Sequence, residues 1–117
     1  MGGLSHANAN YNIAIGSYAG NAIASNAVAG IVLLGYDAGG AINNSAASYS
    51  VGVGYYALQN LTSGAGNTAV GFESLKTITT GVQNTIIGAD SDPSANSGAN
   101  QTVIGYATTG VADNSVT

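Results

Sequence analysis

The sequence predicts an all-β protein folded as a β-solenoid, a chain that winds through successive coils of 17 to 19 residues. Three observations predict it: a glycine that recurs at this spacing, a short β-branched segment before each copy, and a composition almost without charge. Charged residues make up 5% of the 117 positions, against roughly 25% in an ordinary soluble domain. The length fits one domain.

The recurring glycine follows a pair of apolar or small residues in six places, which are Gly16, Gly35, Gly54, Gly71, Gly88 and Gly105. The separations are 19, 19, 17, 17 and 17 residues. In the two most similar copies, Leu58 aligns with Leu75 and Gly64 aligns with Gly81. This period is too short for repeats built from helix pairs and is typical of one coil of a β-solenoid.

The segment before each glycine is predicted to be a strand. The residues three and one positions before it are mostly β-branched: Ile13 and Ile15, Val32 and Leu34, Val51 and Val53, Thr68 and Val70, Thr85 and Ile87, Thr102 and Ile104. The residue between them is also uncharged in every copy. A strand that is apolar on both faces must be covered on both faces. One face lines the coil, so we expect another copy of the chain to cover the other.

The turns are predicted from glycine and asparagine. The recurring glycine fits a corner with positive φ or a close approach between neighbouring backbones. The asparagine before the strand, at Asn67, Asn84 and Asn100, tolerates a left-handed conformation and, if stacked, can form a hydrogen-bonded ladder. Residues 57–61 and 74–78 carry apolar pairs at i, i+3, which fits either one helical turn or a second short strand.

The repeats predict three regions along the chain. Residues 1–9 are a poorly patterned lead-in, and residues 10–48 hold two divergent 19-residue repeats that could form a tip or cap. Residues 49–117 hold the regular 17-residue repeats, and residues 114–117 open a seventh repeat that the sequence cuts short.

The composition excludes several classes of function. One Lys, no Arg and a net charge of −4 cannot neutralise phosphates, which excludes nucleic-acid binding. No Cys and one His exclude zinc sites, thiol nucleophiles and disulfides. Five carboxylates and His6 offer few general bases, so we predict no enzyme, no cofactor and no metal. The longest apolar run, residues 27–35, is about half of the ~20 residues that span a bilayer, so no membrane insertion is expected.

Aromatic and acidic residues are the candidate binding groups. The aromatic residues directly after the glycine, Tyr36, Tyr55, Phe72 and Tyr106, could stack on sugar rings, but one residue per coil is better explained as a packing ladder. Tyr11, Tyr18, Tyr49 and Tyr56 lie outside this column and are expected to be exposed.

From these residues we select Tyr18 and Tyr56 as ligand-binding candidates, together with Asp90 and Asp92 of the loop in residues 89–97. The two aspartates could hold Ca²⁺ or a sugar hydroxyl. Ca²⁺ takes six to eight oxygen ligands, so two carboxylates are weak evidence for it. The alternative is a solvated turn that Pro93 stiffens.

Residues 67–88 read NTAVGFESLKTITTGVQNTIIG. This pattern resembles the Asn-Thr-Ala-Val-Gly-Tyr-x-Ala-Leu-type repeats of phage tail fibres and other trimeric bacterial surface fibres. It is more distantly similar to the Asn-Ser-Val-Ala-Ile-Gly repeats of YadA-like heads in trimeric autotransporter adhesins. The resemblance covers residues 49–117 well and residues 10–48 weakly. It implies a parallel homotrimer of β-rolls, intertwined or side by side, in a fibre on a virion tail or a bacterial cell surface.

The function expected from this resemblance is extracellular attachment to a cell-surface ligand, with a glycan as the first candidate. A purely structural spacer is the alternative, although the irregular arms of repeats one, two and five favour recognition. Ice binding is a second alternative, because Thr68, Thr85 and Thr102 align in three successive repeats.

Overall fold

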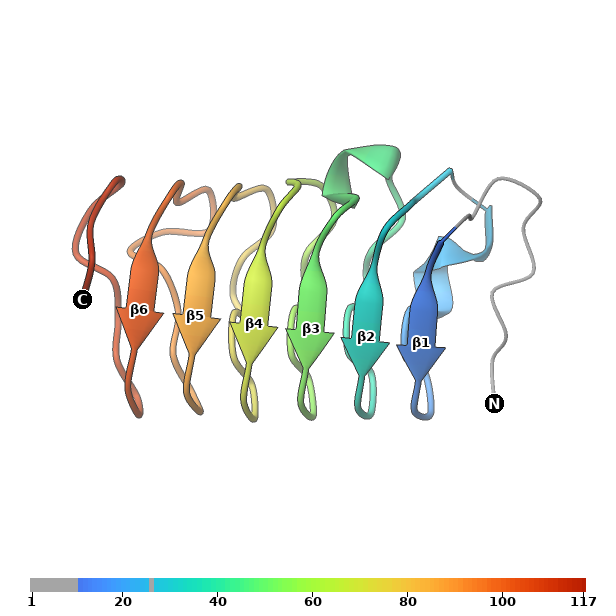
Figure 1. The fold of residues 1–117 in the computed structure, drawn as a ribbon, viewed down its shortest axis with the longest axis horizontal. Helices are drawn as coiled ribbons and strands as arrows, with labels where there is room; N and C mark the ends of the chain where they lie inside the picture. The colour runs from blue at the N-terminus through green and yellow to red at the C-terminus, as the bar shows by residue number, and fades with distance from the viewer. Residues whose placement is uncertain (1–10, 26) are drawn as a thin grey trace.

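The computed structural model describes residues 11–25 and 27–117, and the predicted lead-in of residues 1–9, with His6, lies outside this described part. The chain forms one six-stranded parallel sheet in which the strands follow sequence order (Figure 1). The strands are β1 (Ile13–Ile15), β2 (Val32–Leu34), β3 (Val51–Val53), β4 (Thr68–Val70), β5 (Thr85–Ile87) and β6 (Thr102–Ile104). The predicted all-β solenoid and all six predicted strands are confirmed.

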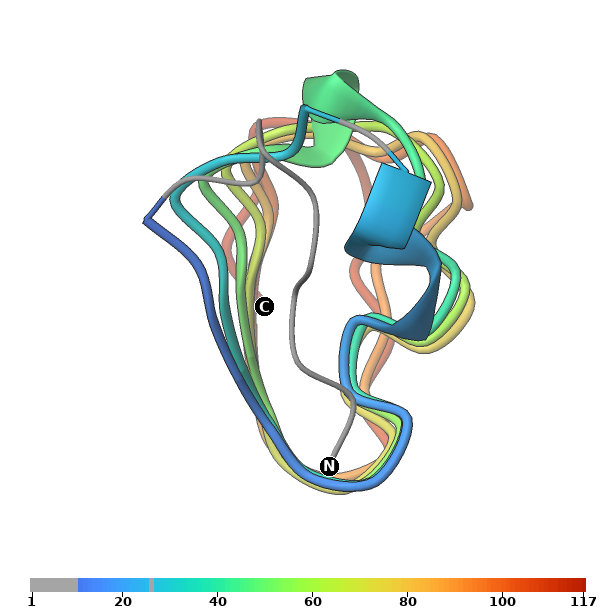
Figure 2. The same cartoon turned by 90° about the vertical axis from the view of Figure 1, so that its right-hand side faces the viewer.

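Each strand pairs in register with the next, so residues at the same offset from the recurring glycine stack in columns along the solenoid axis. Val51 pairs with Thr68, for example, and Val53 with Val70. Viewed along the axis, the coils superpose: the strands form one long side, and a narrow turn follows them (Figure 2). We number each coil by its strand, so that coil 1 begins at β1. Coils 1 and 2 contain 19 residues, and coils 3 to 5 contain 17.

The recurring glycine is required for both predicted reasons. Gly54 has a φ of 142°, and a Cβ there would collide with the carbonyl oxygen of Gly71 in the next coil. Gly71 has a φ of 138° and meets the carbonyl group of Gly88 in the same way. Any side chain in this column would push neighbouring coils apart.

The asparagine prediction is correct in part. Asn100 has the left-handed φ expected, 52°, but Asn67 and Asn84 do not have positive φ and lie one position nearer the strand. They are fully buried, and Asn84 Nδ2 donates to Asn67 Oδ1 at 3.1 Å, which confirms the ladder. Gln101 extends it, because its backbone N–H donates to Asn84 Oδ1 at 3.1 Å. Burial inside the coil makes these amides internal hydrogen-bond partners instead of corner residues.

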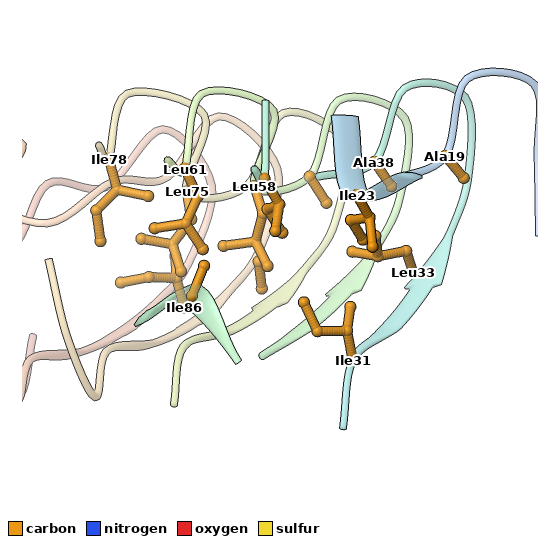
Figure 3. Packing of buried hydrophobic residues seen from close by; sticks show 14 of the residues in the cluster. Ala19, Ile23, Ile31, Leu33, Ala38, Leu58, Leu61, Leu75, Ile78 and Ile86 are labelled. Atoms are coloured by element: carbon orange, nitrogen blue, oxygen red, sulfur yellow. The ribbon is translucent and has the colours of Figure 1, made fainter. Parts of the chain in front are cut away.

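The apolar core fills the coils and is shared between the inward strand residue and the opposite arm. Leu33, Ile86 and Val103 point inward from β2, β5 and β6 and are fully buried. Figure 3 shows Leu58, Leu61, Leu75 and Ile78 packed from the arm opposite the strands. Gly52 leaves the room that this packing needs: a Cβ there would lie 3.1 Å from Leu33 Cδ2 and 3.2 Å from Leu58 Cδ1.

The arms are neither the helical turn nor the second strand considered for residues 57–61 and 74–78. Ala57, Gln59 and Leu61 each donate a backbone hydrogen bond to the residue three positions earlier, which makes a run of tight turns. The two 19-residue coils instead contain short 3₁₀ helices, η1 (Asn21–Ser25) and η2 (Ser45–Ala47). No helix in the described part of the chain has the length and hydropathy needed to cross a bilayer.

Candidate binding surfaces

The outward side of the sheet, which we call the sheet face, is a regular surface that runs over all six strands. It carries two side chains from each strand, and none of these twelve is charged. Nine are Ile, Val or Leu, and the other three are Thr68, Thr85 and Thr102. All are exposed or half-buried, and Ile15 and Ile104 keep 58% and 59% of their surface. Parallel sheets are normally covered on both faces, and a sheet face in contact with water normally carries polar residues, so this face lacks the composition of a solvated surface.

A group of aromatic residues borders the sheet face at the narrow turn after the strands. It consists of Tyr18, Tyr36, Tyr55, Tyr56 and Phe72, and we call it the aromatic corner. The rings of Tyr36 and Tyr55 stack with centroids 5.0 Å apart, and those of Tyr55 and Phe72 with centroids 5.6 Å apart. Three of the four residues of the predicted ladder therefore form one stack. Ala89 occupies the column between Phe72 and Tyr106, which is 78% exposed.

The two predicted tyrosine sites both belong to the aromatic corner. Tyr18 contacts Tyr36 edge-on at 5.8 Å between centroids, and Tyr56 contacts the same ring at 5.6 Å. Tyr18 is exposed as predicted, as are Tyr11 and Tyr49. The prediction for Tyr56 is wrong, because its side chain is half-buried between neighbouring aromatic rings.

Tyr56 is held in its neutral form by its neighbours. A side-chain hydrogen bond with Tyr55 is the main cause that raises the pKa of Tyr56 to about 12, with partial desolvation and the charges of Tyr55, Tyr36 and Asp37 as smaller causes. A tyrosine with its ordinary pKa of about 10 is already neutral at physiological pH, and these contacts extend the neutral range to more alkaline pH.

The positively charged side chain of Lys76 lies on the aromatic corner. Its Nζ is 5.2 Å from the centroid of the Tyr56 ring and 2.9 Å from Glu73 Oε2. Asp37 lies one coil before Tyr56, and its Oδ2 accepts a 2.6 Å hydrogen bond from Gln59 Nε2. The corner thus combines ring faces with hydrogen-bonding and charged groups, a mixture that suits the recognition of a polar ligand with an apolar face.

Asp90 and Asp92 occupy different environments. Asp90 is exposed and follows Tyr56 and Glu73 in the same column of successive coils. Asp92 is half-buried, and its Oδ1 accepts a 3.1 Å hydrogen bond from the backbone N–H of Thr77, so it serves the fold. The loop predicted as a solvated turn buries Ser91 and Pro93 and exposes residues 94–97. Within residues 11–25 and 27–117, no three His, Cys, Asp or Glu side chains group as metal ligands would.

Three charged residues beside the aromatic corner were not selected from the sequence: Asp37, Glu73 and Lys76. A signal for the first two was present, because the second residue after the first five recurring glycines reads Tyr18, Asp37, Tyr56, Glu73 and Asp90. This column of aromatic and acidic side chains lies one residue beyond the aromatic column directly after the glycine.

Comparison of the chain with protein-family models, with curated proteins and with solved structures gave no match. The functional argument therefore depends on the geometry of the two surfaces and on the repeat pattern.

Proposed function

We propose that the chain is a segment of a trimeric extracellular fibre, of the phage-tail or bacterial-surface kind, that attaches to a glycan on a cell surface. The observation that carries the proposal is the uncharged sheet face, which runs without interruption over all six strands. Burying it against identical copies would remove nine apolar side chains per chain from water, each contributing up to ~2 kcal/mol.

A parallel arrangement suits the sheet face because its columns run along the solenoid axis. Copies that share this axis would bring matching columns together over the full length of the molecule, which measures 39 Å along its longest dimension. The number three comes from the resemblance of residues 67–88 to fibre repeats. Such assemblies are rigid, and the aromatic corner at the narrow turn would then be the part available for a ligand.

Attachment to a glycan is supported by the aromatic corner. Sugar rings present apolar C–H faces and polar edges, and they pair with aromatic rings flanked by hydrogen-bonding side chains. Tyr18, Tyr36 and Tyr56 supply the rings, while Asp37 and Gln59 supply adjacent polar groups. An inert spacer has no need of the aromatic corner. A spacer built on the same architecture is the competing interpretation of the chain's function.

Binding of the intact protein to a glycan array tests the attachment role. We expect a defined subset of glycans to bind and Tyr56→Asn to lower their signal at least tenfold. Tyr11→Asn is the matched control, because Tyr11 is 91% exposed outside the corner and has nearly the same left-handed φ, 62° against 60° for Tyr56. Asparagine tolerates this conformation, so both variants should fold. A wild-type protein that binds no glycan would support the spacer.

Ice binding is the second candidate, favoured by one specific observation. Thr68, Thr85 and Thr102 pair in register and point outward, half-exposed, as one column of the sheet face. A regular column of hydroxyl and methyl groups on a flat sheet is a surface that can order water. A monomeric protein that stops ice recrystallisation, and loses this activity in Thr85→Lys, would establish this function in place of the fibre.

A further inference from the structure

The narrow turn places aromatic and acidic side chains in one column along the solenoid. The second residue after the recurring glycine is Tyr18, Asp37, Tyr56, Glu73 and Asp90 in coils 1 to 5. Backbone hydrogen bonds hold these coils side by side, including 2.8 Å from Glu73 N–H to the Tyr55 carbonyl and 2.9 Å from Asp90 N–H to the Phe72 carbonyl. Three of the five carboxylates of the chain thus lie in this one column.

The ammonium group of Lys76 already contacts a tyrosine ring and a carboxylate of this column. Lys76 is the chain's only Lys or Arg residue, and its Nζ both faces the Tyr56 ring and pairs with Glu73 Oε2. The electron-rich face of tyrosine attracts a cation, and a primary ammonium can also donate hydrogen bonds to a carboxylate. The Lys76 side chain keeps 34% of its surface exposed, and an ion pair this exposed contributes ~1 kcal/mol or less. A competing ammonium group can therefore displace it.

Charge complementarity indicates which ligand would displace Lys76. The chain carries a net charge of −4, and a ligand rich in carboxylates or phosphates would be repelled by Asp37, Glu73 and Asp90. A sugar with a free amine has the required chemistry, because its ring can stack on tyrosine while its ammonium group bonds a carboxylate.

We propose that the aromatic corner binds a surface polysaccharide through the free ammonium group of an amino sugar, which replaces Lys76 between Tyr56 and Glu73. This inference rests on the proposed attachment function and names the chemical class of its ligand. The stack of Tyr36, Tyr55 and Phe72 runs along the solenoid axis, so a polysaccharide lying along the same axis would pass the exposed edges of successive rings.

A matched pair of probes tests the proposal on the intact protein. Glucosamine hexamer and N-acetylglucosamine hexamer share a sugar backbone, but only the first carries ammonium groups. Calorimetric titration should show at least tenfold tighter binding of the glucosamine hexamer, with an affinity that weakens as salt is added. Equal binding of the two hexamers, or binding of the acetylated one alone, would overturn the proposal.

Two variants locate the binding group and one controls for charge. Glu73→Gln keeps the shape of the side chain and should weaken binding of the glucosamine hexamer about tenfold, whereas Lys76→Met removes the internal competitor and should tighten it severalfold. Asp113→Asn removes the same charge outside the corner, from the last coil, and should leave the affinity unchanged. An equal loss in Asp113→Asn and Glu73→Gln would mean general charge attraction and would refute the site.

These outcomes separate the inference from the function on which it rests. Suppose that neutral glycans bind on the array through Tyr56 and that glucosamine is not preferred. The attachment function would then stand, and the ammonium ligand would be rejected. A failure of every glycan to bind would reject both.

Discussion

Coils 1 and 2 and coils 3 to 5 build the same sheet but close their turns in different ways. The shorter coils end on Asn67, Asn84 and Gln101, whose buried amides form the ladder. Asn67 Nδ2 donates to the carbonyl groups of Gly64 and Gly81 at 2.9 and 2.8 Å, and Asn84 Nδ2 donates to that of Gly98 at 2.7 Å. Each amide thus satisfies turn carbonyls that the sheet cannot reach.

The longer coils end on Ile31 and Ser50, which carry no amide side chain, and other side chains satisfy backbone N–H groups of their turns. Asn12 accepts a hydrogen bond from Ile31 N–H, and Ser48 Oγ accepts one from Ala29 N–H. Asn44 caps η2 by accepting from Ala46 N–H. Strand register is therefore independent of how a coil closes, because the strands of both kinds of coil pair in register within the same sheet.

Loss of an amide from the ladder should have the largest effect. Asn84→Leu keeps the number and branching of the side-chain heavy atoms but leaves the Gly98 carbonyl and the Gln101 N–H without their partner, and unsatisfied buried groups cost ~1–3 kcal/mol each. We expect the free energy of unfolding to fall by about 4 kcal/mol. Ser50→Ala in the same column of coil 2 should cost only about 1 kcal/mol. Urea unfolding at one protein concentration measures both, and equal losses would contradict the distinction between the coils.

An attempt to extend the ladder into coil 1 should also destabilise the protein. Ile31 is fully buried in the apolar core, so Ile31→Asn exchanges apolar packing for an amide with few partners. The expected loss in the free energy of unfolding is about 3 kcal/mol. A variant as stable as wild type would show that coil 1 accepts the closure used by coils 3 to 5.

The outward residues of the sheet face also change along the molecule, between coil 3 and coil 4, and reciprocal substitutions sharpen this difference. The first outward column reads Ile13, Val32 and Val51 and then Thr68, Thr85 and Thr102. If copies of the chain cover this face, Thr85→Val should strengthen association by about 1 kcal/mol per chain, and Val51→Thr should weaken it by a similar amount. Sedimentation over a dilution series measures the change in association. If neither variant changes association, this column does not belong to the interface.

Asp113 in coil 6 and Tyr56 in coil 3 should respond at opposite ends of the pH scale, with the smallest effects. Hydrogen bonds from Ala99 N–H and the Gln101 side chain lower the pKa of Asp113, so the stabilisation it provides is present above its ordinary pKa and is lost as the pH falls through the lowered value. The pKa of Tyr56 is raised, so its contribution is complete below about pH 10 and is lost as the pH rises through about 12. Thermal unfolding should show that Asp113→Asn removes part of the acid dependence of stability and Tyr56→Phe part of its alkaline dependence, and the reverse assignment would contradict the account.

The sequence was sufficient to predict the strands because the spacing of the glycines and the β-branched pairs specify them independently. It did not predict the environment of Asn67 and Asn84, because asparagine suits both an exposed corner and a buried ladder, and the choice depends on a shift of one residue. The arms could not be assigned, since Leu58 and Leu61 point into the core from a run of turns as well as they would from a helix. The position of Lys76 over the Tyr56 ring could not be predicted, because it depends on the three-dimensional turn that brings coils 3 and 4 together.

The central claim is that identical chains cover the sheet face, and the mass of the native particle tests it most directly. Light scattering on a sizing column should give a mass near three chains of 11.4 kDa. Val53→Glu would place a charge on the face and should give the mass of one chain, whereas Asn43→Glu, on an exposed turn, should leave the trimer intact. A stable wild-type monomer would contradict the account.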